Sequence, residues 1–234
     1  MSFAQLKEEG VFNMLPQYHD ARHAVRDSVI DLVENLKDVN AMALEGVENW
    51  SVEELDRARK EIKDFKTLTE KIDNDIVIIF AKFTPTARDL REMVSYFKIT
   101  SALNRIQNNT NSYLKNMQTV VMEDNSEIKE FIIDSLRINR YTIKAFDYTI
   151  EMLNTFEDDD KIKKLNSKIT VEQSKTEDIY SLLEKEIVQK MSDADVNVQE
   201  YFNLLKYFRK NLKIIDRLET IAQRIIFARM GGKL

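Results

Sequence analysis

Apolar residues recur at three- and four-residue spacings along most of the chain, with polar residues between them. This periodicity is typical of helices that bury one face. The stripe is clearest after Pro16, where it holds Val25, Val29, Val33 and Leu36. The pattern predicts six helices, over residues 17–44, 51–83, 86–121, 126–156, 158–191 and 192–230.

Capping residues predict where the helices of the first half begin. Ser51 and Glu54 match a capping box, in which each side chain hydrogen-bonds a free backbone N–H of the other residue. Gly46 and Trp50 come just before it and are expected in the turn. Residues 84–86, Thr-Pro-Thr, form the next corner, because proline suits the first turn of a helix.

The second half shows the same kind of boundaries. Residues 124–127, Asp-Asn-Ser-Glu, supply a turn and a cap, and the acidic residues 158–160 begin the next helix. Ser192, with Asp195 three residues later, is expected to cap the last helix. The glycines at 231–232 end it, as glycine past a helix end commonly does.

Composition supports an all-α fold. The 234 residues include 4 Gly and 2 Pro, and neither occurs between Thr86 and Met230. Sheets need tight turns that are rich in these residues, so the sequence argues against strands. Six helices of about 30 residues would each be about 45 Å long. The short loops make neighbouring helices antiparallel, which predicts two three-helix bundles.

The same composition excludes several kinds of chemistry. With no Cys and 2 His, the chain lacks the parts of thiolate sites, catalytic triads and histidine-rich metal centres. A net charge of −5 argues against nucleic-acid binding. The longest apolar run, residues 76–81, is about a third of a membrane span, and the first residues do not resemble a signal peptide. We therefore expect a cytoplasmic protein without a cofactor.

The two halves resemble each other. A shift of 112 residues places Leu103-Asn104-Arg105-Ile106 on Ile215-Asp216-Arg217-Leu218, and Lys98 on Lys210. Together with the count of three helices in each half, the match predicts an internal duplication. The first repeat would span residues 1–122, with a short N-terminal extension, and the second residues 123–234.

The start of the third predicted helix carries an unusual pair of cations. Asp89 suits the positive end of a helix, but Arg88 and Arg91 do not, because the helix dipole disfavours cations in the first turn. One interpretation is local helix-start chemistry. The other is that Arg88 or Arg91 contacts a partner or an anion.

The segment Pro85-x-Ala-x-Asp-Leu-Arg91, followed by Lys98-Ile99 and Leu103-Asn104-Arg105-Ile106, resembles the PhoU family of phosphate-uptake regulators. The helix plan matches from about residue 12 to residue 230, whereas the motif is strong only in the first half. The resemblance implies two three-helix bundles without catalytic activity. It also implies an adaptor that binds a phosphate transporter subunit, a phosphate-sensing histidine kinase or both, and that reaches the membrane through them. A homodimer is left open.

The family's metal-binding carboxylates are largely missing. The positions of the two Glu/Asp-x-x-x-Asp pairs hold Asn104 and Asn108 in the first half, and Asp216 and Thr220 in the second. Hard cations need anionic oxygen ligands, so we expect no multinuclear metal cluster. A second metal pattern, Asp20-x-x-His23 with His19, lacks the matching half that a di-metal site requires.

Three further features have two interpretations each. The Asn face formed by Asn104, Asn108 and Asn111 is either solvent-exposed or a satisfied polar network. Glu219 lies among apolar residues, where Arg105 or Arg140 could pair with it, as a structural ion pair or as part of a functional site. The basic stripe of the last helix is either a solvated face or a docking surface for an acidic partner or an anionic membrane. It consists of Lys206, Arg209, Lys210, Lys213 and Arg217 and continues to Arg224.

The leading hypothesis is thus a regulatory adaptor of phosphate uptake and phosphate-responsive signalling. The alternatives are an accessory protein of a sodium- or proton-driven phosphate transporter and a carboxylate-bundle metal-binding protein.

Overall fold

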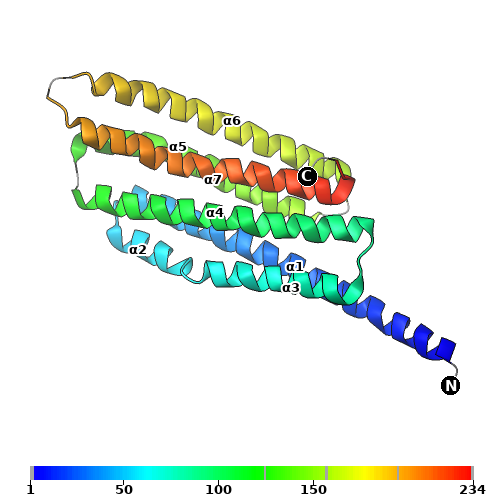
Figure 1. The fold of residues 1–234 in the computed structure, drawn as a ribbon. Helices are drawn as coiled ribbons and strands as arrows, with labels where there is room; N and C mark the ends of the chain where they lie inside the picture. Colours follow the sequence, from blue (N-terminus) through cyan, green and yellow to red (C-terminus); the bar gives the residue numbers. More distant parts are fainter. Residues whose placement is uncertain (1–2, 124, 156–157, 194, 233–234) are drawn as a thin grey trace.

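The computed structural model describes residues 3–123, 125–155, 158–193 and 195–232, with side chains from residue 16 onward. Over these ranges the chain forms α-helices and no strand. The helices are α1 (Phe3–Glu48), α2 (Val52–Glu61), α3 (Phe65–Phe83), α4 (Ala87–Glu123), α5 (Ser126–Asn154), α6 (Asp159–Lys190) and α7 (Val198–Met230). They lie lengthwise beside one another, and the first turns of α1 extend beyond one end of the bundle (Figure 1).

The helices group into two three-helix units. In the first half α1 and α4 contact each other and both contact α2 and α3, which follow one another along the same side. In the second half α5, α6 and α7 all contact one another. The units join mainly through α4 and α7, and secondarily through α1 and α5. The predicted all-α architecture is confirmed, whereas the duplication and its boundary at residues 122 and 123 stay predictions.

The single helix predicted over residues 51–83 is wrong, because a turn at residues 62–64 divides it into α2 and α3. Ile62 and Asp64 leave the helical region only slightly, with φ of −101° and −96°. The side chain of Gln107 donates to the carbonyl of Ile62 at 3.3 Å, which satisfies an acceptor at the interruption. The buried stripe passes through the turn unbroken. It consists of Leu55, Ala58, Ile62, Phe65, Thr69, Ile72, Ile76 and Ile79.

The ends of the first helix also differ from the prediction. The helix α1 passes through Pro16 instead of beginning after it, although proline inside a helix removes a backbone hydrogen bond and crowds the preceding turn. At the other end, Gly46 lies inside α1. A Cβ at Gly46 would lie 3.0 Å from Leu55 Cδ2, so glycine is needed for the close approach of α2. Trp50, with φ of 54°, forms the turn as expected.

The boundaries of the second half are mostly as predicted. Asn125 caps α5 by accepting from Glu127 N at 3.0 Å, and Gly231 ends α7 with φ of 78°. The last helix, however, begins later than predicted, since Asn197 caps it and Ser192 does not. Asp124, in the predicted turn, and Phe156, the predicted end of the fourth helix, lie outside the described residues.

A polar network lies in the middle of the buried core, where both units meet. Asn139 Oδ1 on α5 accepts from Tyr113 Oη on α4 at 3.2 Å and from Asn211 Nδ2 on α7 at 2.6 Å. Thr110 lies three residues before Tyr113 on α4, and it accepts a hydrogen bond from Asn40 of α1 at 3.3 Å. All five side chains are at most 1% exposed, and the hydrogen bond between Tyr113 and Asn139 links the two units in this nonpolar interior.

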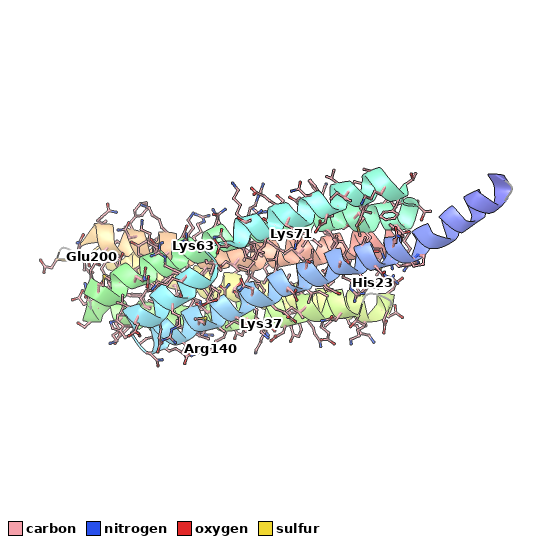
Figure 2. The ribbon with its side chains drawn as sticks, turned by 90° about the horizontal axis from the view of Figure 1, so that it is seen from below. His23, Lys37, Lys63, Lys71, Arg140 and Glu200 are labelled. Atoms are coloured by element: carbon pink, nitrogen blue, oxygen red, sulfur yellow. The ribbon has the colours of Figure 1, made fainter. Side chains whose placement is uncertain are left out.

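Ion pairs add to this junction at the surface between α1 and α5. Lys37 Nζ lies 2.6 Å from Asp147 Oδ1, and Arg140 pairs with Glu48 (Figure 2). Surface pairs of this kind stabilise a protein only slightly, so the apolar core supplies most of the cohesion between the units. Within the described residues, no helix is long and apolar enough to cross a membrane.

Candidate functional site: a cationic groove between two helices

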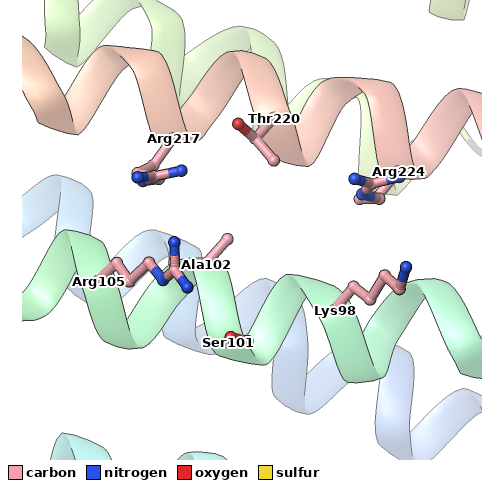
Figure 3. A pocket seen from close by; sticks show the side chains of 7 residues that line it. All are labelled: Lys98, Ser101, Ala102, Arg105, Arg217, Thr220 and Arg224. Atoms are coloured by element: carbon pink, nitrogen blue, oxygen red, sulfur yellow. The ribbon is translucent and has the colours of Figure 1, made fainter. Parts of the chain in front are cut away.

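A groove of about 180 Å³ opens between α4 and α7, the two helices that join the units (Figure 3). Four of its lining residues are cations, two from each helix. The groove is lined by Lys98, Ser101, Ala102 and Arg105 from α4 and by Arg217, Thr220 and Arg224 from α7.

Helical spacing explains why the cations converge. Lys98 and Arg105 are seven residues apart, as are Arg217 and Arg224, and residues seven apart lie on one face of a helix. In Figure 3 Arg217 faces Arg105 across the groove, and Arg224 faces Lys98. The small residues Ser101, Ala102 and Thr220 lie between these cation pairs, which leaves the space open.

Among the described residues, no carboxylate forms an ion pair with the cations of the groove. Lys98, Arg105, Arg217 and Arg224 form no ion pair or hydrogen bond with any of the residues that the structure describes. Other cations of the chain do pair, as Arg22 does with Asp89 at 3.0 Å. Four like charges around one space repel one another, and a guanidinium or ammonium group there can satisfy an anion with several oxygens. By its chemistry the groove is therefore a candidate site for an anion.

The residues of the basic stripe of α7 differ in their exposure to solvent. Lys206, Arg209 and Lys213 are exposed, and Lys206 Nζ lies 4.3 Å from the centre of the Phe202 ring. Lys210 and Arg217 are partly covered, and Arg217 faces α4 across the groove. Only the exposed part of the stripe is open to a protein partner.

At the start of α4 the two arginines differ in their surroundings. Arg88 is exposed and has no partner in the described structure. The guanidinium of Arg91 lies beside Gly231, because a Cβ on that glycine would be 3.9 Å from Arg91 Cζ. Gly231 ends α7, and the C-terminus of a helix is its negative end. The dipole of α7 thus compensates the charge that the dipole of α4 disfavours.

Asp89 and its neighbour Glu92 form a structural cluster with α1. Arg22 Nη1 donates to Asp89 Oδ1 at 3.0 Å and lies 3.8 Å from Glu92 Oε2. Burial raises the pKa of Glu92, while Arg22 and a hydrogen bond from Tyr96 Oη oppose the rise. The sequence analysis did not single out Glu92, because a glutamate on a mixed helix face carries no local sign of burial.

The positions of the metal motif make different contacts in the two halves. Asn104 Oδ1 accepts from Thr69 of α3 at 3.1 Å, and Asn108 is exposed. In the second half Asp216 accepts from Gln173 of α6 at 3.2 Å, and Thr220 donates to the carbonyl of Asp216. In the described part of the chain, no three acidic or histidine side chains are grouped so that they could hold a metal ion.

The histidine pattern of α1 and the Asn face are at least partly open to solvent. His19, Asp20 and His23 are exposed on α1, where Figure 2 labels His23. Within the Asn face, Asn111 accepts from Arg59 Nε at 3.3 Å, so the face is partly bonded and partly open to solvent.

Glu219 is half-buried and forms no ion pair with the residues that the structure describes. Neither suggested partner is available, since Arg140 pairs with Glu48 and Arg105 belongs to the groove. Spacing within one helix does not reveal which helix a charged face meets.

Sequence reasoning did not find the groove as a site. Its signal was present in the shift of 112 residues, which places Lys98 on Lys210 and Arg105 on Arg217. Both helices thus carry cations at seven-residue spacing. The missing information was that α4 and α7 pack against each other.

Comparison with known proteins gives one family match and several similar folds. A family model described as the PhoU domain matches residues 29–117. Two crystal structures cover nearly the whole chain. PhoU from Pseudomonas aeruginosa has a TM-score of 0.81 at 18% identity and covers 92% of this chain and 100% of its own. The phosphate transport system regulatory protein PhoU from Streptococcus pneumoniae has a TM-score of 0.77 at 14% identity, covering 93% and 99%. No curated protein matches.

Proposed function

We propose that this chain, which carries a PhoU domain and has the PhoU fold, regulates phosphate uptake and phosphate-responsive signalling by binding other proteins. The main support is that a phosphate transport regulator shares the fold over 93% of the chain. The partners would be a phosphate transporter subunit, a phosphate-sensing histidine kinase or both. The protein would act in the cytoplasm without catalysis and would reach the membrane through these partners.

The exposed part of the basic stripe is the surface that best suits such a partner. Lys206, Arg209 and Lys213 lie on one face of α7 and have no ion pairs in the described structure. A positive face on a protein of net charge −5 favours electrostatic capture of an acidic partner surface. Each exposed charge contributes only about 0.2–1 kcal/mol, so a single substitution would be a poor test.

The test of this surface is a triple charge reversal, Lys206→Glu, Arg209→Glu and Lys213→Glu, which leaves the groove cations intact. A matched control reverses three exposed lysines on α3 and α6, Lys71, Lys164 and Lys185. Binding to the purified phosphate transporter and to the sensor kinase of the same organism is measured over a range of salt concentrations. The stripe variant should lose binding at least about tenfold and lose part of its salt dependence. Equal affinities for the two variants would contradict the docking surface.

The regulatory role itself is tested in the native host. A strain without this protein should continue to take up radiolabelled phosphate when phosphate is in excess, because the restraint on uptake is gone. Expression of the wild-type chain should restore the restraint. Uptake that is the same in the deleted and the complemented strains would refute the proposed function.

A further inference from the structure

We infer that the groove between α4 and α7 binds a linear oligophosphate, a chain of phosphate groups that contacts cations at both ends of the groove. The inference rests on the geometry of the groove and does not need the regulatory role. Oligophosphate binding can therefore fail while the regulatory proposal stands, and the regulatory proposal can fail while oligophosphate binding stands.

The charge of the groove is the first argument. Acidic residues outnumber Lys and Arg in this chain, 40 to 35, so an average cation has carboxylates near it. In the described part of the chain, the four cations of the groove nevertheless form no ion pair with a carboxylate. Lys98 and Arg105 are exposed and Arg217 and Arg224 are partly covered, so solvent screens part of their repulsion. A bound polyanion would remove the rest. This arrangement is what a site for a multiply charged anion requires.

The nature of the cations is the second argument. Three of the four are arginines, whose planar guanidinium groups donate two parallel hydrogen bonds to the oxygens of a phosphate group. Arg217 and Arg105 face each other at one end, and Arg224 and Lys98 at the other (Figure 3). A phosphate group at either end would thus receive donors from both helices.

The length of the groove is the third argument. Residues seven apart on a helix are separated by about 10 Å along its axis. One orthophosphate reaches a single cation pair across such a distance, whereas a chain of three phosphate groups reaches both pairs. Ala102 and Thr220, which lie between the pairs, carry no charge and leave room for the middle of the chain.

The experiment is a calorimetric titration of the full chain with sodium tripolyphosphate, orthophosphate and ATP in phosphate-free buffer. The groove variant is Lys98→Gln with Arg224→Gln. Its matched control, Arg88→Gln with Lys115→Gln, removes the same two charge types from exposed positions of α4 outside the groove. The second groove variant, Arg105→Gln with Arg217→Gln, replaces the first if that variant does not fold.

The wild type and the control should bind one tripolyphosphate per chain, with an affinity that falls as salt rises and with orthophosphate at least tenfold weaker. The groove variant should lose at least about tenfold in affinity. If ATP binds more tightly than tripolyphosphate, the phosphate groups belong to a nucleotide. If ATP binds more weakly, the ligand is a free oligophosphate. Either supports the inference.

A thermal melt gives a second readout that does not depend on the ligand. Without phosphate, the groove variant should melt at a higher temperature than the control, because two repelling charges are gone. Tripolyphosphate should raise the melting temperature of the wild type and the control but not that of the groove variant. The inference is overturned if no tripolyphosphate binds, if orthophosphate binds equally well, or if groove and control variants behave alike in either experiment.

Discussion

The central polar network makes a quantitative prediction for the substitution Asn139→Leu. Asn139 Oδ1 is the acceptor for both Tyr113 Oη and Asn211 Nδ2, and all three side chains are at most 1% exposed. Leucine leaves both donors buried without an acceptor, at about 1–3 kcal/mol each. The substitution also removes Asn139 Nδ2, which is buried and unpaired in the wild type, and this returns about 1–3 kcal/mol. The expected net loss in the free energy of unfolding is about 1–3 kcal/mol.

Urea denaturation followed by circular dichroism measures this loss. The triple variant Tyr113→Phe, Asn139→Leu and Asn211→Leu removes the donors together with their acceptor, so it should be more stable than the single variant. Asn108→Leu, at an exposed position of α4, is the control and should change the unfolding free energy by less than about 0.5 kcal/mol. The reasoning would be refuted by a triple variant no more stable than Asn139→Leu alone.

Two further predictions concern pH and metal. Burial raises the pKa of Glu92 in the folded state, so its contribution to stability is present in acid and is lost as pH rises through that pKa. Glu92→Gln should therefore gain stability relative to the wild type from about pH 4 to about pH 8 in denaturation experiments, and a constant difference would contradict this. With amides at Asn104 and Asn108 and a hydroxyl at Thr220, the purified protein should carry no multinuclear metal cluster. Elemental analysis that finds two or more transition-metal ions per chain at these positions would disprove it.

The helical architecture was predictable because its signals are local. The scarcity of glycine and proline excluded sheets, and the apolar stripes with their caps located most helix ends. The turn at residues 62–64 was not predictable, because the buried stripe runs through it without a change of period and neither Gly nor Pro marks it. The start of α7 was misplaced because Ser192 and Asn197 are both good caps, and only the tertiary structure selects one.

The site was less predictable than the fold, because it depends on which helices meet. The sequence identified Arg217 and Arg224 as part of a basic stripe and Arg105 as a partner for Glu219. Their true neighbours are one another, across a helix contact between residues more than 100 positions apart in the chain. Spacing within a helix fixes the face on which a charge lies but not what that face meets.

The turn between α2 and α3 also sets a limit on how the chain length can vary. Buried residues before and after it lie in a single helical phase, from Leu55 to Ile79. One residue inserted at positions 62–64 would rotate everything that follows by about 100°, which would turn the stripe of α3 away from the core. Insertions at residues 192–193 or 195–196, between α6 and α7, meet no such requirement, because these residues are not helical. The turn at residues 62–64 looks like a loop, but it should tolerate insertions and deletions as poorly as the middle of a helix does.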